Sequence, residues 1–183
     1  IKGLILNQDY TLGGGPVSPA SPSGGPVGGS VFINYEEIPS WSIVVPEGYT
    51  LTIESGTIIK SVNATSGLLI EGTLIAEGTA GEPIVFTSLH DDEYGGDTNG
   101  DGDWAEYCRT KDPDDSTYLN CPRAGFWGQI VFAPTSTNSS LNYAIIRYGG
   151  TKWGQSYNYQ PDYVLKIESS SLTLANSIIE NNT

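Results

Sequence analysis

Ten carboxylate side chains of this 183-residue chain lie in one polar stretch, between His90 and Asp115. Within it, the segment Asp97-Thr-Asn-Gly-Asp-Gly-Asp103 has oxygen-bearing side chains at alternate positions and a glycine for a sharp turn. This spacing matches the first half of a calcium-binding loop, in which about six to eight oxygen atoms surround a hard cation. We therefore predict a Ca²⁺ site in this segment. The predicted ligands are Asp97, Asn99, Asp101 and Asp103.

The match to a calcium loop is incomplete on its C-terminal side. A full loop places a bidentate Glu about six residues after its glycine. In this chain the glycine is Gly102, and Cys108 occupies the position of that Glu. We expect Asp103 to bind through its backbone carbonyl, and the last ligands to come from other acidic residues. The candidates are Asp91, Asp92, Glu93 and Glu106. The alternative is a solvated acidic loop that holds no cation.

Three short apolar segments precede the acidic loop and must position it. They read Leu68-Leu-Ile70, Thr73-Leu-Ile-Ala76 and Pro83-Ile-Val-Phe-Thr87, and glycines or Gly-Glu-Pro separate them. Each segment is rich in branched residues and too short for a helix, which indicates strands. Three strands with tight corners are typical of one turn of a parallel β-solenoid. Because a lone turn cannot bury its inward side chains, other turns must stack on it.

Similar segments occur on both sides of this turn. Residues 49–60 repeat the Ile-Glu-(Ser)-Gly-Thr-aliphatic motif of this turn. Further strand-like segments are residues 128–132, 141–150, 164–167 and 172–182. We predict an all-β chain that folds as a parallel β-helix of about four turns. Its inward column is expected to pass through Leu51, Leu69, Ile130 and Leu165. The alternative is an antiparallel sandwich of short strands.

Two long insertions interrupt the repeats, at residues 89–124 and 151–162. They follow the segments that end in Phe86-Thr-Ser88 and in Arg147-Tyr-Gly-Gly150. If those segments occupy the same face of successive turns, both insertions leave from one corner and lie side by side. Insertions in solenoid proteins usually build the functional surface, so we expect function to be located at this corner.

The N-terminal segment differs from the repeats. Residues 1–12 contain an apolar strand, and residues 13–30 have the Pro/Gly-rich composition of a linker or a long surface loop. We therefore divide the chain into an N-terminal strand with its linker, residues 1–30, and a β-helix domain, residues 31–183. Two interpretations stay open. The strand either caps the β-helix as an irregular first turn or is donated to a neighbouring subunit by β-augmentation.

The overall composition limits the possible partners and compartments. A net charge of -13 argues against nucleic acid, whose phosphates need a basic surface. The chain has no run of about 18 apolar residues, so we expect no membrane span. It begins with Ile1 and contains no methionine, which predicts a processed chain or a fragment.

The two cysteines point to export, and three sequons are candidate glycosylation sites. Cys108 and Cys121 lie in one polar loop without a histidine cluster, which favours a local disulfide over a zinc site. The alternative is two free thiols. Asn-x-Ser/Thr sequons at predicted corners make Asn63, Asn138 and Asn181 candidates for glycosylation. Asn181 or Asn182 could equally belong to an internal asparagine stack at a turn.

In combination, these motifs resemble the secreted right-handed parallel β-helix repeat proteins of bacteria and archaea. The resemblance lies in residues 51–60, 72–88, 91–92, 95–102, 127–130 and 146–150. It extends over about residues 43–182 and implies a right-handed β-helix, an extracellular or cell-surface location and calcium in the Asp-rich loop. It does not imply one activity, because this fold occurs in lyases, adhesins and structural proteins. The disulfide-bearing extension and the N-terminal linker do not belong to the family pattern.

We expect an extracellular structural protein, in the form of a filament (pilus-like) subunit that joins other copies head to tail through the donated strand. The alternative is a carbohydrate-binding module or a calcium-dependent polysaccharide lyase, so polysaccharide is a second possible partner. A lyase needs a basic residue as proton acceptor beside the cation. The candidates are Arg109, Lys111, Arg123, Arg147 and Lys152. Arg147 lies in a repeat strand, where it could instead pair with acids of the loop.

Overall fold

The computed structural model describes residues 4–6, 8–13, 30–33, 42–62, 66–102, 108, 121–150, 163–169 and 171–183. The secondary structure of these residues consists almost entirely of short β-strands. Among them, no helix has the length and the apolar character that a membrane crossing requires. Asp103, Glu106 and most of the two insertions lie outside the described residues, as do Asn63, Arg109, Lys111 and Lys152.

The strands succeed one another in groups of three, and each group forms one coil. The first coil contains β1 (Leu4–Ile5), β2 (Tyr10–Leu12) and β3 (Ser30–Ile33), and the second contains β4 (Ile43–Val45), β5 (Thr50–Ile53) and β6 (Ile58–Ser61). The third contains β7 (Leu68–Ile70), β8 (Thr73–Glu77) and β9 (Ile84–Ser88). The fourth contains β10 (Ile130–Phe132), β11 (Ser139–Asn142) and β12 (Ala144–Arg147), and the fifth contains β13 (Leu165–Ile167), β14 (Leu172–Ala175) and β15 (Ile178–Glu180).

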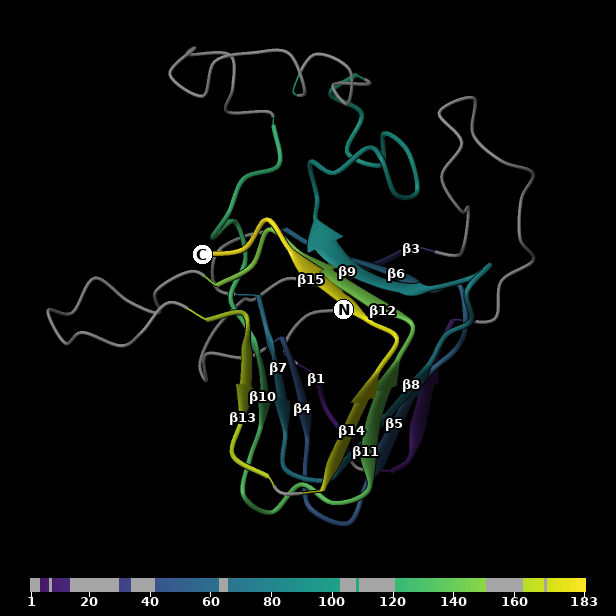
Figure 1. Cartoon of the computed structure of the whole chain (residues 1–183), viewed down its shortest axis with the longest axis vertical. Coiled ribbons are helices and arrows are strands. Elements are labelled where there is room, and N and C mark those ends of the chain that lie inside the picture. The colour runs from purple at the N-terminus through teal and green to yellow at the C-terminus, as the bar shows by residue number, and fades with distance from the viewer. Residues whose placement is uncertain are drawn as a thin grey trace, which may run out of the picture.

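Equivalent strands of successive coils pair in parallel and build three sheets. The first sheet has the order β1-β4-β7-β10-β13, the second has the order β2-β5-β8-β11-β14, and the third has the order β3-β6-β9-β12-β15. Figure 1 shows the sheets as three walls around one core. This arrangement is the predicted parallel β-helix.

The N-terminal segment forms the first of five coils. β1 pairs with β4, β2 pairs with β5, and β3 pairs with β6, all in parallel. The apolar strand segment within residues 1–12, whose partner could not be predicted from the sequence, therefore pairs within its own chain. This pairing matches the interpretation of the segment as a first turn of the β-helix. This coil explains why the β-helix has five coils where the sequence predicted about four.

The predicted inward column is correct for three of its four residues, although they do not share one sheet. Ile130 and Leu165 are neighbours in the first sheet. Leu51 is fully buried but belongs to the second sheet, where it pairs with Leu74, 23 positions later. One coil is thus longer than the 18-residue repeat expected from Leu51 and Leu69.

Leu69 was wrongly predicted to face the core. Its neighbour Leu68 is fully buried and pairs with Ile43 and Ile130, both of which are fully buried as well. Leu69 is only partly buried and points to the opposite side of the sheet, because side chains alternate along a strand. Three consecutive aliphatic residues fit both registers, so the pattern could not decide between them.

From the second coil onward, the long connections leave from one corner of the β-helix. The chain passes from β7 to β8 and from β11 to β12 within three residues or fewer, whereas 41 residues separate β9 from β10 and 17 separate β12 from β13. β9 and β12 are neighbours in the third sheet, with Phe86 paired to Ile146. Both insertions therefore begin side by side, as predicted.

Candidate cation site

The acidic loop after β9 covers the outward face of the third sheet (Figure 1). Every residue of β6, β9 and β12 is buried, although one face of each strand points away from the core. The outward residues Ile58, Val85 and Ile145 form a small apolar cluster, against which Tyr94 of the loop packs. Apolar contact through Tyr94 thus attaches the loop to the sheet, in addition to the charged contacts described below.

A polar column lies beside this apolar cluster on the same outward face. Lys60 pairs with Thr87, and Arg147 pairs with Glu180. The pairing of Ile146 with Phe86 places Arg147 next to Thr87. Four successive strands thus present polar side chains to the start of the loop. The sheet thus places two positively charged side chains, those of Lys60 and Arg147, beside a segment that is otherwise rich in carboxylates.

Arg147 forms the first attachment point of the loop. Its Nε lies 3.6 Å from the Asp91 carboxylate, and its Nη1 lies 2.9 Å from the Glu93 carboxylate. The Thr87 hydroxyl donates a further hydrogen bond to Asp91. The guanidinium also lies over the rings of Tyr94 and Tyr148, at 5.3 and 4.6 Å from their centroids. Arg147 pairs with loop acids, as the sequence suggested for it.

Burial and charge act against each other in this pair. Burial would lower the pKa of the Arg147 guanidinium, but Asp91, Tyr148 and Glu93 outweigh it and raise that pKa. Burial also raises the pKa of the Asp91 carboxyl, against the opposing effects of Arg147 and the Thr87 hydroxyl. Arg147 is therefore a permanent buried cation, and Asp91 is an acid that is easier to protonate than usual.

Lys60 forms the second attachment point. Its ammonium donates hydrogen bonds of 2.9 Å to the Asp91 carbonyl oxygen and of 2.8 Å to the Gly96 carbonyl oxygen. The residue is fully buried. Burial lowers its pKa, while the neighbouring carboxylates of Asp91 and Asp92 act to raise it. Sequence reasoning did not single out Lys60. The available signal was a charged residue inside the aliphatic run Ile58-Ile-Lys60, in a strand whose two faces are both covered.

The carboxylates of Asp92, Asp97 and Asp101 converge above this lysine. Each offers an oxygen atom, and these atoms all lie within 4.8 Å of one another. Asp97 and Asp101 belong to the predicted ligand set, and Asp92 was among the candidates for the last ligands. Asp92 is buried, whereas Asp97 is exposed. The cluster therefore opens towards solvent on the side of Asp97.

The backbone of the loop is turned by its own side chains. The Asp97 carboxylate accepts hydrogen bonds from the amides of Gly100, at 2.7 Å, and Gly102, at 3.0 Å. Gly100 has a φ of 75° and Gly102 a φ of 101°, which is a left-handed conformation that favours glycine. The two glycines of the calcium-loop pattern are thus required by the turn itself.

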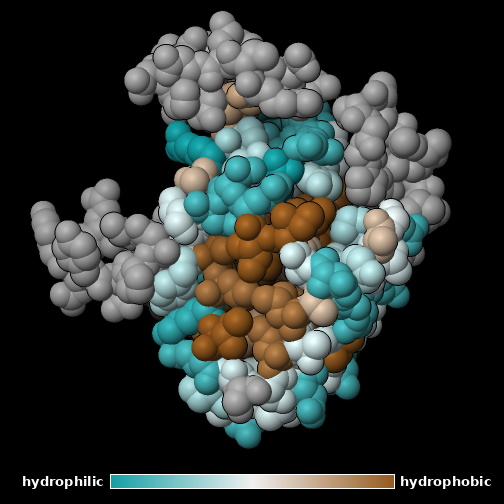
Figure 2. Space-filling view, in the orientation of Figure 1, coloured by the Kyte–Doolittle hydropathy of each residue, from teal (hydrophilic) through white to brown (hydrophobic). Residues whose placement is uncertain are grey.

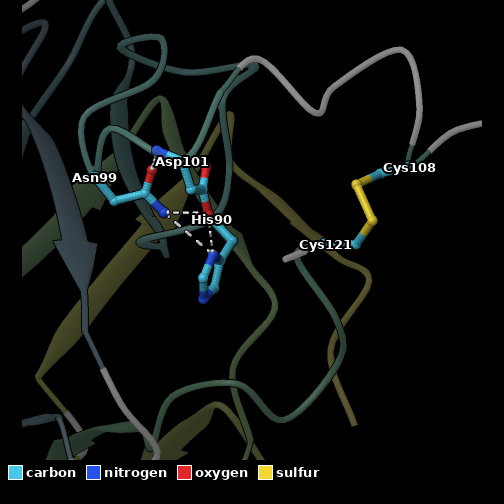
Figure 3. Close-up of a disulfide and its surroundings, with 5 residues drawn as sticks. All are labelled: His90, Asn99, Asp101, Cys108 and Cys121. Atoms are coloured by element: carbon cyan, nitrogen blue, oxygen red, sulfur yellow. Dashed lines mark hydrogen bonds and ion pairs between the residues drawn. A yellow bond between two sulfur atoms is a disulfide. The ribbon is translucent and has the colours of Figure 1, made fainter. Parts of the chain in front are cut away.

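Asn99 and His90 both contact the Asp101 carboxylate (Figure 3). Asn99 Nδ2 donates to Asp101 Oδ2 at 2.8 Å, and His90 Nδ1 lies 3.2 Å from the same oxygen. The side-chain oxygen Oδ1 of Asn99 accepts a hydrogen bond from the backbone amide of Asp101 at 3.3 Å. Asn99, itself a predicted ligand, therefore lies directly beside the predicted ligand Asp101. Beside it, the His90 ring meets Phe126 edge to face, with a centroid distance of 5.0 Å.

The predicted disulfide joins Cys108 to Cys121. Figure 3 shows it at a separate place from the polar group of His90, Asn99 and Asp101. Cys121 is fully buried. The alternative of two free thiols is excluded, because both cysteines of the chain are in this bond. The bridge closes the distal part of the first insertion.

The residues of the loop fit a hard divalent cation. All three convergent groups are carboxylates, which are the ligands that Ca²⁺ prefers in proteins. The Thr98 hydroxyl oxygen is buried, and the described residues give it no hydrogen-bond partner. Buried polar atoms normally have a hydrogen-bond partner, and Thr98 directly follows Asp97 in the sequence.

The remaining predicted residues lie elsewhere. Asn138 and Asn181 are exposed residues in left-handed conformation, each with a φ of 54°. The internal hydrogen bonds near the last turn belong to Asn182, which accepts from the Gly149 amide and donates to the Ile146 carbonyl oxygen. Neither sequon lies near the acidic loop in sequence.

No protein-family model, no curated protein and no solved structure matches this chain.

Proposed function

We propose that this protein is an extracellular structural β-helix whose acidic loop binds Ca²⁺. The observation that supports it most directly is the convergence of Asp92, Asp97 and Asp101 within 4.8 Å on a loop that the sheet holds in place. The disulfide supports an extracellular location, since such bonds persist mainly in oxidising compartments. The bound cation would neutralise carboxylates that otherwise repel one another.

Charge favours a divalent ion at this position. Three carboxylates and the Lys60 ammonium beside them leave two net negative charges, which one divalent cation balances. The carboxylates come from separated positions of an irregular loop. Ca²⁺ accepts such flexible geometry, whereas Mg²⁺ demands a near-ideal octahedron. We therefore name Ca²⁺ as the ion, with Asp92, Asp97 and Asp101 as its protein ligands. Asn99 and Asp103 remain proposed as further oxygen donors.

A structural role fits this loop better than a lyase does. A proton acceptor must reach the substrate and must be able to lose its own proton. Lys60 is fully buried and bonded to two carbonyl oxygens. Arg147 is 5% exposed, is paired with Asp91 and Glu93, and has a raised pKa. Both basic residues that the third sheet directs at the loop thus serve to hold it.

The last described coil supports a second part of the proposal, which is self-assembly. Ile167, Leu174 and Ile179 pair with the fully buried residues Phe132, Leu141 and Ile146 of the preceding coil, so their side chains point inward. Between 41% and 48% of each of the three is nevertheless exposed. Figure 2 shows the apolar patch that results at this end of the β-helix. Apolar surface of this kind marks an interaction site.

We propose that another copy of the chain covers this end. Among the described strands, β13, β14 and β15 end the three sheets on one side, and β1, β2 and β3 end them on the other. Head-to-tail stacking of copies would continue all three sheets in parallel, and because such a contact does not close on itself, it would build a filament. The N-terminal strand then pairs with β4 by one edge and with β13 of the next subunit by the other.

A melting experiment tests the cation part of the proposal. At a Ca²⁺ concentration ten times the dissociation constant, binding stabilises the folded state by about 1.4 kcal/mol. For a chain of this size, that shift raises the melting temperature by about 3–6 °C relative to chelator. An equal concentration of Mg²⁺ should raise it less. Identical melting curves in Ca²⁺ and in chelator would contradict the proposal.

A further inference from the structure

We propose that Lys60 is the positioning residue of the cation site: its ammonium holds the turn of residues 91–96 in the shape that brings Asp92 and Asp97 together. The proposal rests on the Ca²⁺ binding proposed above for the acidic loop. It assigns to a strand residue of the β-helix a role in the affinity of a loop that lies outside the β-helix.

The two hydrogen bonds of Lys60 reach both ends of this turn. Its Nζ lies 2.9 Å from the Asp91 carbonyl oxygen and 2.8 Å from the Gly96 carbonyl oxygen. In sequence, Asp92 directly follows the first carbonyl and Asp97 directly follows the second. A single ammonium thus fixes the backbone beside two of the three convergent carboxylates.

The site of Lys60 leaves it little freedom to move. Its side chain is fully buried between β6 and the loop, and a buried ammonium is tolerated only where hydrogen bonds and opposite charges compensate its desolvation. Two backbone carbonyls and the nearby carboxylates of Asp91 and Asp92 provide this compensation. The lysine therefore helps to define the position of the turn through groups of the chain itself.

Positioning and repulsion make opposite predictions for a variant without the ammonium. If Lys60 acted mainly by repelling a second cation, its removal would strengthen Ca²⁺ binding. If it positions the turn, removal leaves two buried carbonyl oxygens without their donor and lets the carboxylates separate, so binding weakens. Hydrogen bonds to a charged group contribute enough each that we expect Lys60→Met to lose at least about tenfold in Ca²⁺ affinity.

Two readouts test the proposal, and one of them needs no metal. Hydrogen exchange in chelator should become faster in residues 89–102 of Lys60→Met, while the strands of the other two sheets stay protected. Titration calorimetry should show the loss of Ca²⁺ affinity. Lys60→Arg keeps the charge and the donors and should restore most of both. Lys166→Met is the matched control, because it removes an exposed lysine that pairs with Glu168 far from the loop in sequence.

The possible results separate this proposal from the proposed function. Wild-type protein that binds no Ca²⁺ overturns the proposed function, and the exchange experiment then still decides whether Lys60 holds the turn. Wild-type protein that binds Ca²⁺, together with Lys60→Met that binds it equally or more tightly and exchanges at the wild-type rate, overturns the role of Lys60. If Lys60→Met does not fold, Lys60→Gln, which is uncharged but keeps a donor, is measured in its place by the same two readouts.

Discussion

The Arg147 guanidinium and the Asp91 carboxylate approach to 3.6 Å with side chains that are only 6% and 1% exposed. Arg147 is the last residue of β12, and Asp91 lies three positions after the end of β9. The pair therefore connects the acidic loop of one coil to the strand of the next coil. Such a connection makes the loop part of the β-helix stack, even though the loop leaves the repeat.

Removal of Arg147 should destabilise the protein strongly. In Arg147→Met, the Asp91 carboxylate stays buried without its counter-ion, and breaking a buried pair in this way costs about 3–5 kcal/mol. We expect this loss in the free energy of unfolding measured with urea. The exposed Arg123 offers the control variant Arg123→Met, which should change stability by less than about 0.5 kcal/mol.

A double variant checks the cause of that loss. Arg147→Met combined with Asp91→Asn removes both charges, so it should recover part of the stability that the single arginine variant loses. Additive effects of the two substitutions would show that the buried pair is not coupled, and would contradict the connection described for the loop.

The raised pKa of Asp91 predicts a specific pH dependence. The folded state holds a proton on this carboxyl at pH values where the unfolded chain, with a value near 3.8, has already lost it. The contribution of Asp91 to stability is thus fully present below 3.8 and is lost as the pH rises through the folded pKa. In chelator, the stability difference between wild type and Asp91→Asn should shift in favour of wild type on acidification. A difference that is constant with pH would contradict this.

Assembly should depend on the inward side chains of the last described coil. Leu174→Lys places a charge where a neighbouring coil would bury a leucine, whereas Thr173→Lys changes the adjacent residue on the outward, exposed face of the same strand. By light scattering, wild type and Thr173→Lys should form species that grow beyond 19.5 kDa with concentration. Leu174→Lys should stay monomeric. A wild-type chain that is monomeric at every concentration would refute the filament.

The repeat pattern made the fold predictable, because the branched segments and tight corners of residues 67–88 have few other solutions. The register was harder to predict. Leu68 and Leu69 are chemically identical neighbours, and only the pairing with Ile43 and Ile130 decides which of them enters the core. The first coil was left open for a similar reason, since the connection between β2 and β3 has the composition of a linker.

The candidate site could be predicted in part. The spacing of Asp97, Asn99 and Asp101 follows from local loop chemistry and is visible in the sequence. The contribution of Lys60 is not visible there, because this residue lies 31 positions from Asp91 and meets it only through the stacking of β6 and β9. For Arg147, the sequence suggested a pairing with acids of the loop but not with which acid, because Asp91 lies 56 positions away and meets it only through the stacking of β9 and β12. Sequence reasoning thus named Asp92, Asp97 and Asp101, which the structure brings together, and did not name Lys60, whose ammonium contacts the same turn.

Calorimetric titration of Ca²⁺ into the full chain, after treatment with chelator, tests the central claim most directly. We expect one ion per chain with a dissociation constant of about 0.1–1 mM, as is usual for extracellular calcium modules. Asp92→Asn and Asp101→Asn should each abolish or greatly weaken the signal, while the exposed Glu54→Gln control should keep it. A wild-type chain that shows no heat of Ca²⁺ binding, or variants of Asp92 and Asp101 that bind like wild type, would contradict the assignment of this loop as a calcium site.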